Sequence, residues 1–181
     1  MSMQLSGFTD EVSSDLETQI EASRALGWSL LDLRTLDGGN VVDVSDELFD
    51  EAVKRLSEAR LGVSSFGSAL ANWGRTVDTP LEEEVAQLRR AARRMRKLGT
   101  KYLRVMSYQM PENAPVGALP ELEREILSRL RRFAEVAEEE GIVCLHENCE
   151  TWGGQSVEHT LRIIEATRSE SFKLVFDTGN P

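Results

Sequence analysis

The chain has 181 residues, of which 40% are hydrophobic and 29% are charged, and this composition is typical of one folded domain spanning residues 1–181. The formal net charge of -10 argues against nucleic acid as a partner, because the average field repels phosphate backbones. No apolar run approaches the ~20 residues that span a bilayer, and residues 1–7 lack a basic stretch followed by an apolar one. We therefore expect a cytoplasmic protein with no membrane partner.

One sequence pattern recurs along the chain: a charged amphipathic segment, a glycine, and a short apolar run. The four glycines are Gly27, Gly62, Gly99 and Gly141. A glycine adopts the left-handed backbone conformation without a side-chain penalty, so it can end a helix and turn the chain into the next strand. The repeats therefore predict helices that alternate with strands.

The predicted elements, taken in chain order, are bounded by start and stop signals. Ser14 to Glu17 has the pattern of a capping box, and Pro80 follows Thr79 at a predicted helix start. The predicted helices are 14–26, 46–60, 80–98, 120–140 and 156–168. The predicted strands are 5–9, 30–35, 62–67, 101–107, 142–147 and 172–177. This alternation predicts an α/β fold with a parallel sheet and right-handed crossovers.

The ends of the predicted strands decide between an open doubly wound sheet and a closed barrel. Thr9-Asp10-Glu11 follows the first strand, where a dinucleotide-binding sheet would have a glycine-rich loop. Polar residues collect instead at the carboxyl ends of the strands, as in a (β/α)8 TIM barrel: Asp10, Glu11, Asp32, Arg34, Arg104, His146, Glu147 and Asp177. A complete barrel has eight strands and about 250 residues. We therefore expect a TIM-barrel type domain that is truncated after its sixth strand.

Two conspicuous groups of side chains predict no site of their own. The basic residues between Arg89 and Lys97 share a helical pattern with Glu82 to Glu84, which is typical of a solvated helix face. Cys144 and Cys149 match neither a disulfide framework nor a zinc-binding spacing, so we expect them to be free thiols.

Two segments place a carboxylate at the tip of a predicted strand. Glu147 ends the strand 142–147, and Asp177 ends the strand 172–177. Carboxylate oxygens are preferred ligands of hard divalent cations, and neighbouring barrel strands would bring the two acids to the same rim. On spacing alone, the alternative is that these acids cap following helices or form surface ion pairs.

At these residues the sequence resembles the sugar phosphate isomerase/epimerase group of the xylose-isomerase-like barrel superfamily. The similar stretches cover nearly the whole chain and are Phe8-Thr9-Asp10-Glu11-Val12 with Asp15-Leu16-Glu17, Leu31-Asp32-Leu33-Arg34 with Gly39-Asn40-Val41, Leu98-Gly99-Thr100 with Arg104, His146-Glu147-Asn148, and Phe176-Asp177-Thr178-Gly179-Asn180. The resemblance implies that Glu147 and Asp177 are ligands of a catalytic divalent metal, which would be Mn, Mg, Co or Zn. It also implies that a histidine and a glutamate beyond Pro181 are the other ligands.

The activity implied by this resemblance is isomerisation or epimerisation of a small sugar or sugar phosphate. The metal would hold adjacent hydroxyl and carbonyl oxygens and stabilise the enediolate that forms when a proton leaves. Glu147 would act both as a ligand and as the catalytic acid/base. A chain of this length would hold about half of the site and would be inactive alone.

Five further residues are candidates for contact with the substrate. Arg34 and Arg104 have the planar donor fork that binds phosphate or carboxylate, although ion pairs to Asp10 or Asp32 explain them equally well. The other candidates are Trp73 and Trp152, in loops where an aromatic ring can stack on a sugar, and His146. Strand alternation directs His146 away from Glu147, toward the helices or the rim.

Three alternatives remain open. The same scaffold hosts dehydratases of cyclic polyols and endonucleases that cut at abasic DNA sites, and a fold does not fix a reaction. The endonuclease is disfavoured by the acidic charge and by the presence of only 2 histidines. A non-catalytic module is the third alternative, since an incomplete barrel has open strand edges through which the chain would form a homodimer.

Overall fold

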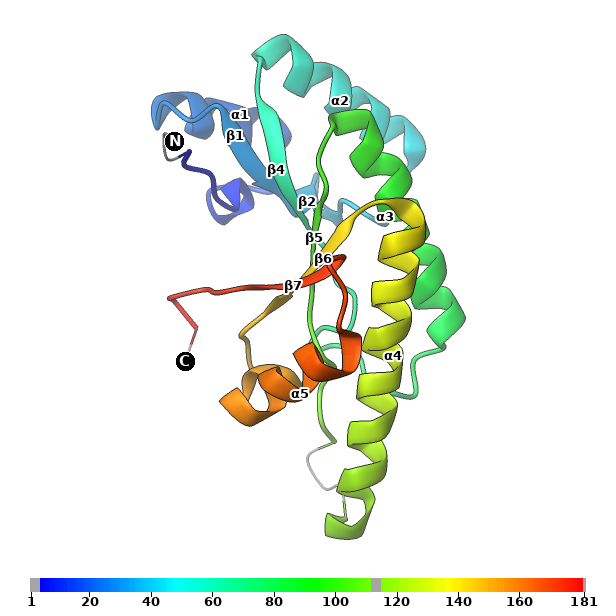
Figure 1. The fold of residues 1–181 in the computed structure, drawn as a ribbon. Coiled ribbons are helices and arrows are strands. Elements are labelled where there is room, and N and C mark those ends of the chain that lie inside the picture. Colours follow the sequence, from blue (N-terminus) through cyan, green and yellow to red (C-terminus); the bar gives the residue numbers. More distant parts are fainter. Residues whose placement is uncertain (1–3, 112–114, 181) are drawn as a thin grey trace. The chain divides into compact units, whose positions relative to one another are not determined.

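The computed structural model describes residues 4–111 and 115–180, and its ribbon alternates helices with strands of a parallel sheet (Figure 1). The predicted α/β class is confirmed. By its internal contacts the chain divides into two compact units. Unit 1 comprises Met1–Ser68 and Arg90–Leu103, and unit 2 comprises Ala69–Arg89 and Arg104–Pro181. No helix among the described residues has the length and apolar character needed to cross a membrane.

Unit 1 is built on two parallel strands and the helices that follow them. Its elements are η1 (Thr9–Glu11), α1 (Leu16–Ala25), β1 (Leu30–Leu33), β2 (Thr35–Leu36), β3 (Gly39–Asn40), α2 (Asp46–Ala59), β4 (Gly62–Gly67), the second part of α3 (Leu81–Leu98) and the start of β5 (Tyr102–Val105). Strand β1 pairs in parallel with β4, and β4 lies between β1 and β5 in the sheet. The core of this unit contains Leu31, Phe49 and Phe66, whose side chains are buried because strand alternation and the apolar face of α2 direct them inward.

Two predictions about unit 1 are wrong in detail. The expected first strand, 5–9, is reduced to a single parallel bridge between Phe8 and Asp32, because the chain turns into η1 directly afterwards. The N-cap of α1 is Asp15 rather than Ser14, since the Asp15 carboxylate accepts from the backbone N–H of Thr18 at 2.8 Å.

Unit 2 contains the remaining helices and strands. They are the first part of α3, the end of β5, η2 (Val116–Ala118), α4 (Leu119–Glu140), β6 (Val143–Glu147), η3 (Trp152–Gly154), α5 (Val157–Thr167) and β7 (Phe172–Val175). Strand β6 lies between β5 and β7, and it pairs in parallel with β7 so that Glu147 is opposite Val175. Buried Phe133 on α4, Cys144 on β6 and Ile163 on α5 belong to the core that joins these helices to the sheet.

The glycine prediction holds at three of the repeats. Gly27, Gly99 and Gly141 have φ angles of 68°, 71° and 70°, in the left-handed region. Gly62 does not, because the left-handed residue that ends α2 is Arg60, with φ 57°. Gly62 instead begins β4, where a Cβ atom would lie 2.7 Å from Leu30, so close packing of two strands explains this glycine.

The expected solvated face of α3 is also wrong at two positions. Arg94 is buried in unit 1, where its guanidinium donates to the backbone carbonyls of Val41 and Val44, both at 2.7 Å. Glu84 is fully buried in unit 2 and accepts from the Tyr108 hydroxyl. The helical periodicity predicts α3 itself, but it does not reveal which charged side chains have buried polar partners.

Candidate functional site

The carboxyl ends of β5 and β6 bring a buried ion pair together in unit 2. Glu147 is the last residue of β6, and its side chain is 8% exposed. Arg104 on β5 is similarly buried, and its Nη1 lies 3.4 Å from Glu147 Oε2. The positive charge compensates the burial of the carboxylate, which would otherwise be costly. This end of the sheet therefore places a carboxyl group and a guanidinium side by side where both are largely screened from water.

Asp177 is held through its backbone by Asn148, the residue that follows Glu147. The Asn148 side chain donates from Nδ2 to the carbonyl of Asp177 at 3.0 Å, and its Oδ1 accepts from the Asp177 N–H at 2.7 Å. The Asp177 carboxylate accepts from the Gly179 N–H at 2.8 Å. Glu147 is in register with Val175, the last residue of β7, so the predicted strand 172–177 is two residues too long and Asp177 lies just beyond the end of the strand that neighbours β6.

These two acids fit a hard divalent cation in the chemistry of their donors. Both offer carboxylate oxygens, the ligands that suit Mg or Mn, and the Asn148 amide holds the backbone of Asp177. Over residues 4–111 and 115–180, no group of three or more His, Cys, Asp or Glu is arranged to hold a metal.

His146 lies on the other face of β6, as strand alternation predicts. Its ring is 1% exposed, and Nε2 lies 3.0 Å from the Ser107 hydroxyl, which also accepts from the Gly153 N–H at 2.6 Å. Burial lowers the pKa of His146 to about 4, so the ring is neutral at pH 7. No sequence pattern pointed to Ser107, which joins His146 to Thr151 through hydrogen bonds.

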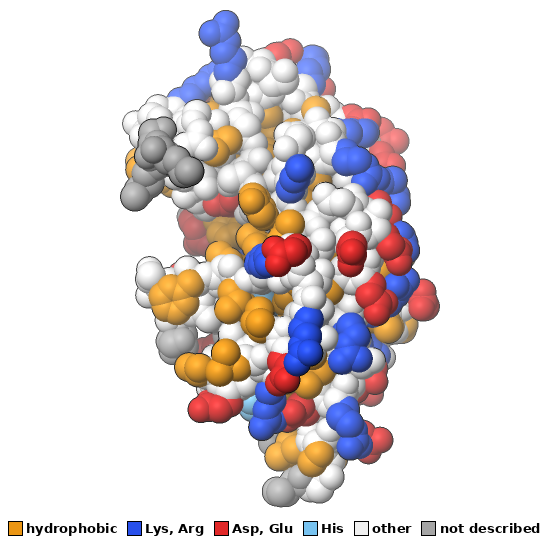
Figure 2. Space-filling model, viewed as in Figure 1, with side chains coloured by type: hydrophobic (Ala, Val, Ile, Leu, Met, Phe, Trp, Pro, Cys, Tyr) orange, Lys and Arg blue, Asp and Glu red, His pale blue; other side chains and the backbone are white. Residues whose placement is uncertain are grey.

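A largely apolar groove adjoins His146 on this second face. Its volume is about 490 Å³, and its lining includes His146, Asn148, Val157, Leu161, Leu174 and Phe176. Four of these residues, Val157, Leu161, Leu174 and Phe176, are exposed and form what we call the apolar strip. Figure 2 shows hydrophobic side chains at the surface over α5 and β7. Glu147 does not line the groove, whereas Asn148, which holds the backbone of Asp177, does.

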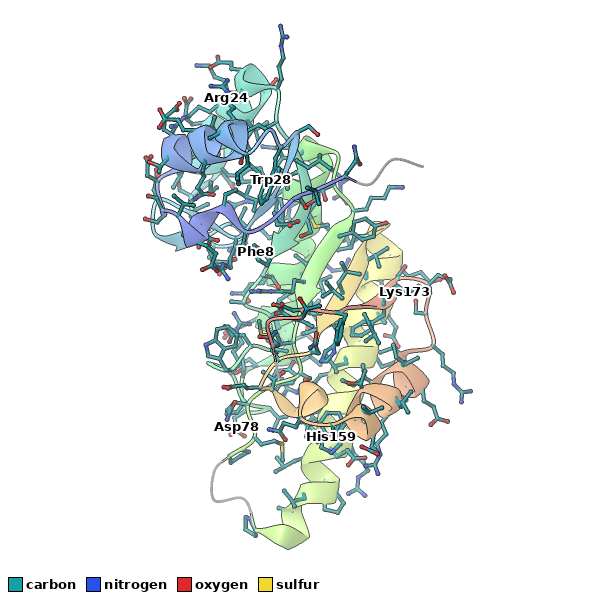
Figure 3. All side chains as sticks on the ribbon, turned by 90° about the vertical axis from the view of Figure 1, so that its left-hand side faces the viewer. Phe8, Arg24, Trp28, Asp78, His159 and Lys173 are labelled. Carbon is teal, nitrogen blue, oxygen red and sulfur yellow. The ribbon has the colours of Figure 1, made fainter. Side chains whose placement is uncertain are left out.

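The two candidate tryptophans have opposite environments. Trp152 is 3% exposed, and its ring stacks on His159 with the centroids 4.4 Å apart. His159, labelled in Figure 3 on α5, also bonds the Trp152 carbonyl through Nδ1 at 2.7 Å. Trp73, in the segment after β4, is 58% exposed. Of these two tryptophans, Trp73 is the one that presents an open aromatic surface.

Arg34 belongs to unit 1 and forms ion pairs there. Its Nε lies 2.8 Å from the Asp10 carboxylate and its Nη2 lies 2.5 Å from that of Glu11, while the guanidinium lies over the Phe8 ring. Asp32, which the sequence offered as another partner for Arg34, accepts instead from Ser65 at 2.7 Å and from two other serines. The sequence left two roles open for Arg34, substrate binding and an ion pair to Asp10 or Asp32. The ion pair to Asp10 agrees with the second of these roles.

Comparison with solved structures gives the same architecture. A D-tagatose 3-epimerase-like protein matches with a TM-score of 0.77 and 17% identity over 98% of this chain and 66% of its own. A xylose isomerase-like TIM barrel protein from Mycobacterium smegmatis, solved in complex with magnesium, matches with a TM-score of 0.74 and 14% identity over 98% and 65%. The probable 3-DHS dehydratase AsbF from Bacillus anthracis matches with a TM-score of 0.74 and 13% identity over 97% and 63%. This chain therefore spans slightly less than two thirds of each.

Parallel strands with polar side chains at their carboxyl ends, together with these matches, define a β/α-barrel protein. No curated protein sequence matches the chain. The model of the xylose isomerase-like TIM barrel family matches residues 20–181, and the chain belongs to that family.

Proposed function

We propose that this chain is part of a divalent-metal-dependent isomerase or epimerase of sugars or sugar phosphates, in which Glu147 and Asp177 are two of the metal ligands. The observation that carries the proposal is the buried Glu147 at the end of β6, with the backbone of Asp177 held on the neighbouring chain segment by one hydrogen bond donated by Asn148 and one that Asn148 accepts. Epimerase-like and magnesium-bound proteins among the structural neighbours support it.

Each residue of the candidate site would have its own role in the proposed reaction. A bound metal would polarise the oxygens of the sugar and favour loss of a neighbouring proton. Glu147 would move that proton, since a carboxylate screened from water is suited to acid/base transfer. Arg104 would compensate the negative charge of Glu147 and would bind an anionic group of the substrate. Asn148 would orient Asp177 through its backbone.

Metal titration of the chain tests the ligand assignment. We expect calorimetry with Mn²⁺ or Mg²⁺ to detect binding that is lost in Glu147→Gln and in Asp177→Asn, because each change removes a charged oxygen ligand. Glu150→Gln is the matched control, since Glu150 is an exposed acid in the same segment. Undiminished binding in the two ligand variants would exclude these residues as ligands.

Activity belongs to the whole protein and needs a separate test. We propose that the chain alone is inactive, because the donors that it brings together are too few to complete a metal site among the described residues. In a version extended to the length of the structural neighbours, Glu147→Gln should abolish ketose isomerisation or epimerisation. Normal turnover in that variant would refute the role of Glu147 in proton transfer.

Two other functions have specific support. The dehydratase among the neighbours favours a polyol dehydratase as the second reaction on this scaffold, and an assay for loss of water rather than isomerisation distinguishes them. The apolar strip and strand β7 favour a self-associating module. Light scattering with and without Mn²⁺ distinguishes the self-associating module from the metal-dependent enzyme. A dimer whose mass does not change when Mn²⁺ is added favours the module. The free, buried thiols of Cys144 and Cys149 support a cytoplasmic location for either.

A further inference from the structure

A tight turn after β4 carries the exposed Trp73 at its tip. The N–H of Gly74 donates to the side-chain oxygen of Asn72 at 3.0 Å, and the N–H of Arg75 donates to the Asn72 carbonyl at 3.0 Å. These bonds close the backbone around Trp73, whose residue remains 58% exposed. A large aromatic ring is thus presented to solvent by a short, internally bonded segment.

A single buried oxygen holds both sides of this turn. Oε1 of Glu84, on α3, accepts from the backbone N–H of Ala71 at 3.1 Å and from Nη1 of Arg75 at 2.9 Å. Ala71 lies two residues before Trp73 and Arg75 lies two residues after it. The side chain of Glu84 is 0% exposed, so these charge-assisted bonds form where water does not compete for the carboxylate.

The other oxygen of Glu84 fastens the turn to the segment that follows β5. Oε2 accepts from the Tyr108 hydroxyl at 2.5 Å, and the Tyr108 N–H donates to the Ala71 carbonyl at 2.6 Å. Burial and the charge of Glu84 raise the pKa of Tyr108, so its hydroxyl stays a donor. Ala71 and Tyr108 have φ angles of 53° and 66°, in a region that residues with side chains rarely adopt. Bonds to Glu84 oppose relaxation of both residues.

We propose that Glu84 is the positioning residue for Trp73, and that the turn it anchors presents the indole for stacking on the face of a sugar ring. The choice of a sugar rests on the proposed function. Strained backbone that is fixed by a buried charge is typical of segments whose conformation matters for binding. A turn that only linked β4 to α3 would not require an exposed indole or a fully buried carboxylate beneath it.

Fluorine NMR of the chain labelled with 5-fluorotryptophan tests the positioning without any ligand. Trp73→Phe assigns the Trp73 resonance by its loss, and the Trp28 resonance, from unit 1, reports on intact folding. We expect Glu84→Gln to shift and broaden the Trp73 resonance, because the charge that holds both sides of the turn is lost. Arg75→Met should also shift and broaden the Trp73 resonance. Because this variant removes one anchor of the turn and keeps the Glu84 carboxylate, it provides the test if Glu84→Gln does not fold.

The matched control is Glu83→Gln, which makes the same change at an exposed neighbour on α3 and should leave the Trp73 resonance in place. An unchanged Trp73 resonance in folded Glu84→Gln and Arg75→Met would overturn the positioning role.

Addition of a ketohexose such as D-tagatose then tests the ligand, with Mn²⁺ present. We expect the parent Trp73 resonance to shift with sugar, and we expect a smaller shift at the same sugar concentration in Arg75→Met. If the anchor variants disturb Trp73 but sugar never moves the resonance in the parent, sugar stacking is overturned while the role of Glu84 stands. A failure of the positioning role of Glu84 and a failure of sugar stacking on Trp73 therefore give different results.

Discussion

Replacement of Arg94 by methionine should destabilise unit 1 strongly, although Arg94 belongs to a run of otherwise surface arginines. Its guanidinium donates to the carbonyls of Val41 and Val44 at 2.7 Å and to the Asp46 carboxylate at 2.7 Å. It also lies over the ring of Phe49, with 4.9 Å to the centroid. Methionine keeps most of the apolar stem and removes every donor, so it isolates the contribution of the hydrogen bonds.

The magnitude follows from the burial of each partner. The bond to Val41 is buried and involves a charged donor, so its loss leaves a carbonyl without a partner at a cost of about 2 kcal/mol. The bond to Val44 is partly buried, and solvent can replace it in part, so about 1 kcal/mol is expected. Asp46 has a side chain that is 85% exposed and contributes little. The total is about 3 kcal/mol.

Urea unfolding followed by circular dichroism measures this change in the free energy of unfolding. With a denaturant dependence of about 2 kcal/mol per molar, the midpoint of Arg94→Met should fall by about 1.5 M. Arg93→Met is the control, because Arg93 is exposed on the same helix and should change stability by less than about 0.5 kcal/mol. If the two variants unfold at similar urea concentrations, the buried carbonyl bonds do not stabilise unit 1 as argued.

Three other outcomes are expected. Gly154→Ala should destabilise unit 2 in thermal unfolding because a Cβ atom would lie 1.9 Å from a backbone oxygen, whereas Gly117→Ala, with nothing within 4 Å, should leave the melting temperature unchanged. Cys144 should react with a disulfide reagent only in urea, because burial raises the pKa of its thiol to about 12; rapid reaction of the native chain would contradict this. Leu161→Glu, in the apolar strip, should reduce self-association measured by light scattering, and Leu26→Glu, at a similarly exposed leucine of unit 1, should not.

The regular elements could be predicted because their signals are local. The predicted helices end within two residues of the observed ones, as in 46–60 against Asp46–Ala59 and 120–140 against Leu119–Glu140. Apolar residues at the helical period and residues that stop the helix act within a few positions of each other, so the sequence alone carries this information. The family resemblance is confirmed by the match over residues 20–181.

The details that escaped prediction depend on partners far away in the sequence. The short β2–β3 hairpin was missed, although its turn, Asp37-Gly38, has the composition that favours such hairpins. Glu84 gave no sign of burial, because its role depends on Arg75, Tyr108 and the backbone of Ala71. Charge patterning within one helix cannot distinguish an acid that faces water from one that organises two loops.

The alternation of β6 places two neighbouring polar residues, Glu147 and His146, on opposite faces of the sheet. Glu147 meets the guanidinium of Arg104, and its charge is compensated at the end of the strand. His146, one residue earlier, turns to the opposite face, where burial lowers its pKa to about 4 and its Nε2 meets Ser107. At pH 7 the imidazole is therefore neutral and belongs to the packing beneath η3 and α5. A histidine beside a candidate metal ligand is not itself evidence for a ligand, since a step of one residue along a strand changes the face of the sheet.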